Sequence, residues 1–388
     1  MKLQFRRSFI LGVLAATGLA CAAKPPPGTA LIQMPWPDSE GVYSLQAVAV
    51  PTLNNTKTMQ GAAATIKIHA GPNGPQPEAN FVVDGDGVLI PGDYLTLQMS
   101  VAYAHLEKLM FIEQRLGLDA LLPRPRKITI EYPMYDESGA AVFDNAFYYP
   151  TWDSLVLLPY RRRELPITVN AGILAHEHFH AIFQHTLGSA PAAAELHGLE
   201  ISWAELPSVS CGEDMKREVS ARAVGKPAGR NAPMVILRAL NEGLADFWGW
   251  YYTRDENFIA HSLPHAGPTR RVVSQLKTLP DEKFFEAISR VEDTRTLLTT
   301  AYCLGTYFSR FARRLADVEG ADEVAGRLLR NLIRMRSQSQ IKVKPDLVLS
   351  LFFASSSELT PSRCTMIKDF TAALTDSALS KACEVPQP

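Results

Sequence analysis

The stretch 174–180 contains the pattern His-Glu-x-x-His, formed by His176, Glu177 and His180. Residues four apart on a helix lie on one face, about one turn from each other. The two histidines can therefore bind one Zn²⁺ through their ring nitrogens. Glu177 would stand beside the metal without binding it, where it can accept a proton from metal-bound water. The pattern indicates a metal-dependent hydrolase, most simply a peptidase.

The residues around this pattern predict that it lies on a buried helix. Asn170 is suited to cap the N-terminus, and small or apolar residues lead into the pattern and continue to Phe183. A histidine pair can also be an ordinary core feature. However, three histidines and a carboxylate buried without a partner would cost several kcal/mol. We therefore expect a bound zinc ion.

A catalytic zinc ion needs a third protein ligand, and the segment 241–249 offers one. Glu242 and Asp246 are four residues apart on a predicted helix whose other residues are mainly apolar. Glu242 is expected to bind zinc, while Asp246 would accept a hydrogen bond from the far ring nitrogen of a ligand histidine. Acidic residues also favour helix N-termini, but this helix is expected to begin near Asn231, several turns earlier.

His-Glu-x-x-His followed by a helical Glu-x-x-x-Asp resembles the signature of the gluzincin metallopeptidases, which include thermolysin-like and fungalysin-like enzymes. The resemblance extends over about 95–315. It implies an α+β fold with the zinc site in a cleft between an N-terminal β-containing lobe and a mainly α-helical C-terminal lobe. Residues 188–232 exceed what a compact gluzincin has at this point, and we expect them to form a surface insertion.

Two regions upstream of the zinc pattern fit the same resemblance. A helix is expected from Asp93 to Gly117, followed by a strand from Lys127 to Glu131. Asn145 and Ala146 are similar to the start of the edge strand that pairs with the substrate backbone in thermolysin-like enzymes. The resemblance thus implies that these two residues bind substrate.

Downstream, the resemblance implies residues that contact the reacting groups. Tyr302 begins a Tyr-x-x-Gly sequence similar to one that opens a helix in several gluzincins, where the donor stabilises the tetrahedral oxyanion. His261 and His265 are the alternative donors. An arginine in a similar place contacts a substrate carbonyl in the family, and Arg270 or Arg271 would take that role.

The N-terminus has the pattern of an export signal. A basic start precedes an apolar run at 9–20, which is too short to span a bilayer. The run ends in Gly18–Ala20 before Cys21, which resembles a bacterial lipoprotein box. We expect 1–20 to be removed, Cys21 to be acylated and 21–40 to form a tether to the outer membrane or cell surface. Plain secretion, or release into the periplasm, is the alternative.

The charge balance argues against two classes of partner. Lys and Arg number 39 and Asp and Glu 40, so losing the basic residues Lys2, Arg6 and Arg7 leaves 39 − 3 = 36 and a balance of 36 − 40 = −4. Such a chain has no excess positive charge for nucleic acid or for an anionic membrane surface. The expected partners are a peptide or protein substrate, and a membrane reached through the lipid at Cys21.

Four cysteines remain after Cys21, and an even number in an exported protein allows two disulfides in three connectivities. We prefer Cys364 with Cys383, because both lie in the expected C-terminal helical region. Cys211 with Cys303 would then tie the insertion to the helix that carries Tyr302.

The remaining pattern divides the chain into expected regions. Turn signals and alternating residues predict strands at 41–90, within an N-terminal α+β lobe at 41–165. A zinc-peptidase lobe at 166–316 and a C-terminal helical region at 317–388 follow. Helices late in the chain are expected at 295–316, 320–337 and 361–380.

Together, these features predict an enzyme: a zinc peptidase, most simply an endopeptidase, with Glu177 as general base. The main alternative is a surface lipoprotein that keeps the fold and the zinc as a non-catalytic binding module. A second alternative is a zinc hydrolase that acts on a non-peptide bond. Glu177 disfavours the binding module, because a scaffold has no use for that carboxylate.

Overall fold

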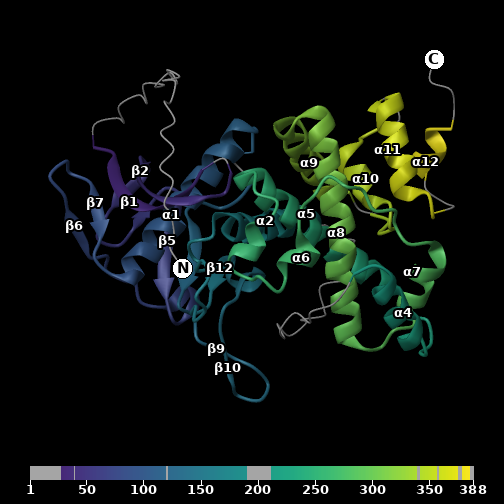
Figure 1. Cartoon of the computed structure of the whole chain (residues 1–388), viewed down its shortest axis with the longest axis horizontal. Coiled ribbons are helices and arrows are strands. Elements are labelled where there is room, and N and C mark those ends of the chain that lie inside the picture. Colours follow the sequence, from purple (N-terminus) through teal and green to yellow (C-terminus); the bar gives the residue numbers. More distant parts are fainter. Residues whose placement is uncertain are drawn as a thin grey trace, which may run out of the picture.

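The protein has an α+β fold in which the strands precede most of the helices; the strands lie on one side of the molecule together with α1 (Tyr94–Arg115), and most of the other helices lie on the opposite side (Figure 1). This confirms the α+β part of the predicted fold class. Cys21 and the predicted signal peptide lie outside the residues that the structure describes. The computed structural model describes residues 28–38, 40–118, 121–189, 211–338, 341–355, 358–374 and 378–384.

The first sheet has four strands in the order β2-β1-β7-β6. The strands are β1 (Ala30–Pro37), β2 (Tyr43–Val50), β6 (Phe81–Val83) and β7 (Leu89–Pro91). β1 pairs with β2 along its whole length and turns Ile32 and Met34 into the core. The prediction that the tether reaches residue 40 is therefore wrong, because 30–37 form a strand that pairs with β2 on one side and contacts β7 on the other.

A long helix, α1 (Tyr94–Arg115), packs against this sheet. Asp93 caps the helix by accepting a hydrogen bond from Thr96 N. Trp36 of β1 stacks on His105 of α1 with 4.1 Å between the ring centroids. The helix predicted from Asp93 to Gly117 is thus confirmed apart from its ends.

The second sheet has the order β11-β12-β8-β5. The strands are β5 (Ala64–Ile68), β8 (Arg126–Ile130), β11 (Ala146–Tyr149) and β12 (Ser154–Leu157). β5, β8 and β12 run parallel, while β11 runs antiparallel at one edge. The predicted strand at Lys127 corresponds to β8. Two short hairpins complete the strands: β3 (Leu53–Asn55) with β4 (Gln60–Gly61), and β9 (Met134–Tyr135) with β10 (Ala141–Val142).

Three long helices lie at the centre of the molecule (Figure 1). They are α2 (Ala171–His185), α5 (Asn231–Thr253) and α8 (Thr294–Glu319). Among the described residues, the other α-helices after β12 are α4 (Glu213–Arg222), α6 (Gly267–Arg270), α7 (Glu282–Ile288), α9 (Ala321–Arg336), α10 (Leu347–Phe352), α11 (Pro361–Thr371) and α12 (Ala378–Ala382). The 3₁₀ turns are η1 (Gly71–Asn73), η2 (Pro150–Trp152), η3 (Leu187–Ser189) and η4 (Phe258–His261).

Part of the predicted surface insertion is a packed helix. α4 turns Met215 and Val219 inward, each 1% exposed, and packs against α7 and α8. The described end of 188–232 therefore contributes to the core, which corrects the expectation of a purely surface segment. Residues 190–210 lie outside the described part of the chain.

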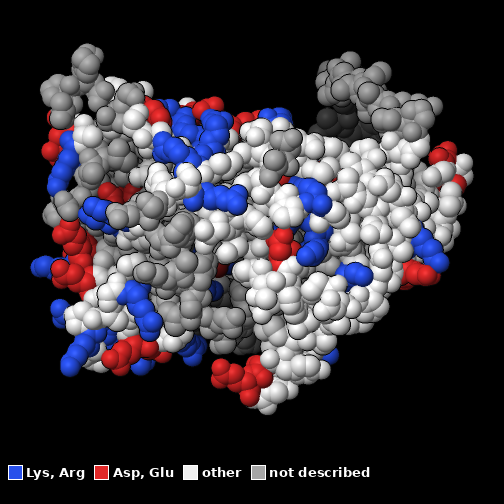
Figure 2. All heavy atoms as spheres, turned by 180° about the vertical axis from the view of Figure 1, so that it is seen from behind, with Lys and Arg blue, Asp and Glu red and all other residues white. Residues whose placement is uncertain are grey.

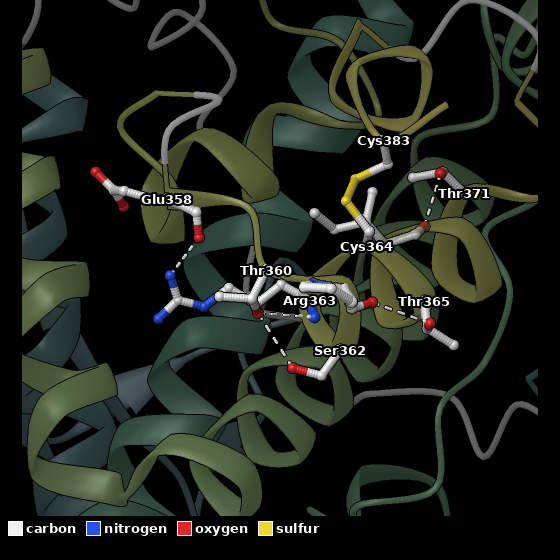
Figure 3. Close-up of a disulfide and its surroundings, with 10 residues drawn as sticks. Glu358, Thr360, Ser362, Arg363, Cys364, Thr365, Thr371 and Cys383 are labelled. Carbon is white, nitrogen blue, oxygen red and sulfur yellow. Dashed lines mark hydrogen bonds between the residues drawn. A yellow bond between two sulfur atoms is a disulfide. The ribbon is translucent and has the colours of Figure 1, made fainter. Parts of the chain in front are cut away.

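The helix predicted at 361–380 is wrong in its extent, because α11 ends at Thr371 and α12 begins only at Ala378. A disulfide joins Cys364 and Cys383 with a Cα–Cα distance of 5.3 Å (Figure 3). These cysteines are 19 residues apart, and one continuous helix of that length would span about 28 Å. The chain must therefore turn back between the two helices.

A second disulfide joins Cys211 to Cys303, so both preferred pairings are confirmed. Cys211 stands just before α4 and Cys303 lies on α8 next to Tyr302. The bond therefore fastens the described end of the insertion to the helix that carries Tyr302, as expected.

One hydrophobic core runs through both halves of the molecule. It includes Ile32 from the first sheet, Phe179 from α2, Phe308 from α8 and Phe370 from α11. The predicted boundaries at 165/166 and 316/317 therefore do not separate independent cores, and α8 crosses the second of them. Among the described residues, no helix combines the length and apolar character that crossing a membrane requires.

Charged side chains are unevenly spread over the face shown in Figure 2. The side built from the N-terminal strands, on the right in that view, shows few of them. The helical side carries basic and acidic groups intermixed. From Tyr43 to Gly92 the only Lys, Arg, Asp or Glu residues are Lys57, Lys67, Glu78, Asp84 and Asp86. The absence of a nucleic-acid partner stays a prediction.

Candidate metal centre

α2 and α5 bring His176, His180 and Glu242 together. One ligand atom from each lies within 4.8 Å of the others, and all three residues are buried. The two Nε2 atoms are 3.0 Å apart. The Glu242 carboxylate lies 3.6 Å from His176 Nε2 and 4.0 Å from His180 Nε2. These residues form a group that could hold a metal ion, as the sequence predicted.

The donor set and spacing of this group fit a metal of zinc's size. Two imidazole nitrogens bound to one tetrahedral zinc, each about 2.0–2.1 Å from it, lie about 3.3 Å from each other. The separation of His176 and His180 is close to that value. A cation would also satisfy ring nitrogens and a carboxylate that otherwise face one another in a buried space. Imidazole and carboxylate ligands suit zinc and several other divalent metals.

The start of α2 is fixed by contacts that position the ligands one turn later. Asn170 caps the helix by accepting hydrogen bonds from Gly172 N and Ile173 N, as predicted. Its side-chain amide also donates to Phe258 O at 2.7 Å. A Cβ at Gly172 would lie 2.4 Å from the Phe258 ring, so only glycine allows this approach. The cap and the glycine together hold the helix against η4.

Asp246 lies on the outer side of His176. Its Oδ1 is 3.0 Å from His176 Nδ1, and its carboxylate accepts hydrogen bonds from Arg270 at 2.6 and 3.1 Å. Arg270 Nη2 is also 3.5 Å from Glu242 Oε2, so this guanidinium borders the metal group. Arg271 instead pairs with a carboxylate away from the centre. Of the two arginines singled out in the sequence, Arg270 reaches the site and Arg271 does not.

A residue that the sequence prediction missed orients the second histidine. Asn241 Oδ1 lies 2.9 Å from His180 Nδ1. An amide oxygen only accepts, so the His180 proton belongs on Nδ1 and Nε2 is left for a metal. Burial lowers the pKa of His180 to about 4, which keeps the ring neutral. In the sequence, the clue to this role was that Asn241 directly precedes Glu242.

Glu177 faces the group from α2 at a greater distance. Its oxygens lie 4.0 Å from His176 Nε2 and 3.9 Å from His180 Nε2. Oε2 has no hydrogen-bond partner among the described residues. Burial raises the pKa of Glu177 to about 8, and the nearby Glu242 carboxylate adds to the rise. A buried carboxylate that lies beside a metal group and has one oxygen without a hydrogen-bond partner is placed to accept and release a proton.

The third histidine of the pattern, His178, fastens α2 to the rest of the fold. Its Nε2 hydrogen-bonds to Glu113 of α1, and Glu113 also accepts from Arg124. The ring is fully buried, so it belongs to a structural network rather than to the metal group. No role was predicted for Glu113, because its partner on α2 lies far from it along the chain.

The edge strand β11 passes beside Glu177. Leu158 N donates to Asn145 O, and backbone groups alternate in direction along an antiparallel strand. Ala146 and Tyr148 therefore turn theirs to the free edge, where the Tyr148 N–H lies near the Glu177 carboxylate. The Asn145 side chain accepts from Ala146 N at 2.9 Å. The predicted substrate strand thus lies at a sheet edge next to the candidate base.

Tyr302 reaches the centre because α5 and α8 cross at two glycines. A Cβ at Gly243 would lie 2.2 Å from Gly305 O, so larger residues would push the helices apart. Gly243 follows Glu242, and Gly305 stands one turn after Tyr302. The crossing brings the half-buried Tyr302 near the metal group, with the Arg270 guanidinium carbon 5.3 Å from its ring centroid.

The two alternative donors are engaged elsewhere. His261 pairs with Asp255 at 2.6 Å, and His265 lies 3.3 Å from Arg162 Nη1. Neither ring contacts the metal group among the described residues.

No protein-family model matches the chain, and no curated protein has a significantly similar sequence.

Proposed function

We propose that the protein is an exported zinc-dependent endopeptidase of the gluzincin type. The observation that carries this proposal is the placement of Glu177: it is buried, near both histidines, and has one oxygen without a partner in the described structure. A metal site that only stabilised a fold would have no use for this carboxylate.

His176, His180 and Glu242 would hold the zinc. When bound, zinc would acidify a water and polarise the scissile carbonyl. Glu177 accepts the proton of the attacking water and returns it to the leaving amine. Asp246 keeps His176 in the tautomer that leaves Nε2 for the metal. Each residue has a role that matches its observed contacts.

Substrate would lie along β11 as an added strand. Ala146 and Tyr148 direct their backbone groups to the free edge, as described above. Asn145 Oδ1 already accepts from Ala146 N, so an incoming peptide carbonyl would replace this internal contact. Tyr302 would donate its hydroxyl to the developing oxyanion. Arg270 would contact a substrate carbonyl from the side of Asp246.

The lobes of the gluzincin architecture and the route of export belong to the same proposal. The sheets and α1 would form one wall of the cleft, and the helices from α5 onward the other. The lipoprotein-like sequence before Cys21 supports anchoring of the mature chain to a bacterial membrane.

The test is peptide turnover by wild type and Glu177→Gln, each with and without a chelator. Gln keeps the shape of Glu but cannot accept a proton, so turnover should fall about a hundred- to ten-thousand-fold while zinc is retained. Glu256→Gln, which changes a carboxylate that pairs with Arg271, should leave turnover unchanged.

Unchanged turnover in Glu177→Gln would remove that residue from the mechanism. A zinc-loaded wild type that cleaves no member of a broad peptide library would favour the binding module. Turnover confined to esters or other non-peptide bonds would favour the second alternative.

A further inference from the structure

Three consecutive arginines, Arg161, Arg162 and Arg163, stand in the loop between β12 and α2, and all three are exposed. Arg162 makes two contacts that join separate parts of the chain. Its Nε lies 3.2 Å from Asp144 Oδ2, and its Nη1 lies 3.3 Å from His265 Nδ1. Arg162 therefore bridges the segment before β11 and the segment before α6.

Both of the bridged segments lead to the metal group. β11 passes beside Glu177, as described above, and the other segment ends at Arg270, which borders the metal group. The loop that carries Arg162 is also fastened to this second segment, because Tyr160 OH donates to Ser262 O at 3.1 Å. Arg162 is thus held where the two segments meet.

The regular edge of β11 ends beside this bridge. Asp144 has a φ of 56°, a left-handed conformation that interrupts the extended backbone of a strand. Its Oδ1 accepts a hydrogen bond from Arg161 N at 2.6 Å, which ties the arginine loop to the start of the strand. A peptide paired with β11 would therefore lose its regular backbone partners beyond Asn145, and side chains of the loop would lie next to it.

The charge at this point is positive. Of the three arginines, only Arg162 forms an ion pair within the described part of the chain. Against the three cations stand the carboxylates of Asp144 and Glu164, which leaves a balance of 3 − 2 = +1. A guanidinium has five N–H donors in a fork that matches a carboxylate. Arg162 uses only two of them in its contacts with the described residues.

We propose that Arg162, flanked by Arg161 and Arg163, binds a carboxylate of the substrate where the peptide leaves β11, and so selects acidic peptides. The proposal rests on the peptidase function proposed above. Asp144 precedes Tyr148 by four residues, so at about 3.3 Å per residue the carboxylate would lie roughly three to five residues from the scissile bond. It can belong to an Asp or Glu side chain or to the C-terminus of the peptide.

The test has two sets of matched peptides. One set carries Glu or Gln at single positions on either side of the scissile bond, and the other ends in a free carboxylate or an amide. In one of the sets, wild type should prefer the charged peptide about ten-fold in kcat/KM, as one charge-assisted hydrogen bond allows. The difference should lie mainly in KM, because Arg162 does not touch the reacting groups.

Arg162→Gln should reduce this preference to about two-fold or less, while it cleaves the uncharged peptides as wild type does. The set in which the preference is lost identifies the source of the carboxylate. A wild type that cleaves charged and uncharged peptides equally in both sets would overturn the inference, and so would a preference that survives in Arg162→Gln.

Two further variants keep the result interpretable. Arg222→Gln removes the same charge from α4, where Arg222 pairs with Glu218, and should leave the preference unchanged. An equal loss in Arg222→Gln would assign the effect to net charge and overturn the inference. Arg163→Gln breaks no ion pair of the described structure and should lower the preference about two-fold, so it carries the test should Arg162→Gln fail to fold.

A binding assay separates a failure of this proposal from a failure of the proposed function. If wild type cleaves no peptide, the proposed function fails, and fluorescence anisotropy of the labelled peptides with the full chain tests the carboxylate site directly. The charged peptide should bind about ten-fold more tightly to wild type, and Arg162→Gln should remove the difference. Equal affinities in wild type would overturn the inference. Peptide cleavage without a carboxylate preference would overturn it too, but would leave the proposed function intact.

Discussion

Replacing Asp246 with Asn should weaken zinc binding, and the loss should grow as pH rises. In the metal-free protein, burial alone would lower the pKa of His176, but the carboxylates of Asp246 and Glu242 beside its ring raise it to about 9. The charged ring therefore stabilises the metal-free fold at neutral pH, and this contribution disappears as pH rises through about 9. The affinity for zinc should instead increase with pH, because the ring must lose its proton before Nε2 can bind the metal.

The size of the effect follows from these two contributions. Wild-type zinc affinity should rise about ten-fold per pH unit from neutral pH until the pKa of His176 is passed. In Asp246→Asn, the new amide oxygen would still accept from His176 Nδ1, but the charge and the ion pair with Arg270 would be lost. Loss of such an outer partner costs about 10- to 100-fold in affinity. The same change lowers the pKa of His176, which reduces proton competition near neutral pH and offsets part of the loss.

The assay is competition with a chromophoric chelator at about pH 7 and about pH 10, on either side of the His176 titration. Asp246→Asn should show the full deficit at the higher pH and a smaller one at the lower. Arg271→Gln, a change at the neighbouring arginine that does not reach the centre, serves as the control. Wild-type affinity in Asp246→Asn at the higher pH, or an equal deficit at both, would refute the reasoning.

Other contacts lead to three further predictions. Glu242→Ala should lose the zinc, about one per chain, that wild type retains on dialysis; retention would place the third ligand elsewhere. Cys21→Ser should release the protein from the detergent phase of a detergent–water partition, and a soluble wild type without acyl mass would contradict the anchor. Asp153→Asn removes a charge that pairs with the buried Arg126 at 3.0 and 2.9 Å. Burial alone would raise the pKa of Asp153, but hydrogen bonds from His185 and Arg126 outweigh it and hold that pKa below its usual range. Asp153 thus stabilises the fold above about pH 4. Urea unfolding should show a loss of about 2–3 kcal/mol at neutral pH that shrinks in acid, and a constant loss would contradict this account.

The metal group could be predicted because its residues belong to two pairs, and the members of each pair lie only four positions apart in the sequence. Helical spacing alone places His176 over His180 and Glu242 over Asp246. The pairing of these two helices needed one further assumption, that a buried metal requires a third ligand. The contact of Asn241 with His180 could not be read in this way, since it depends on how α5 lies against α2.

The errors at the ends of the chain have a related cause. Residues 30–37 include Pro35 and Pro37 and follow a proline-rich stretch, so composition favoured a tether over a strand. The inner position of β1 comes from pairing with β2 and contact with β7, which local composition does not contain. The chain after Thr371 turns back so that Cys383 meets Cys364, and this contact between distant residues is not contained in local helix propensity.

The bond between Cys211 and Cys303 encloses α5 and α6, and so encloses Glu242, Asp246 and Arg270 but neither His176 nor His180. Closing a loop of this size lowers the entropy of the unfolded chain, which in the entropic account raises the free energy of unfolding by about 4–5 kcal/mol. A metal ion bound at this site would also favour the folded chain, so occupancy of the site and oxidation of the thiols would be thermodynamically linked. Each must strengthen the other by the same factor. A chain in a reducing compartment should therefore be a weaker zinc binder than the same chain after oxidation. On the proposed function, the redox state of the surroundings, as well as the supply of metal, would then set the fraction of the protein that holds a metal ion.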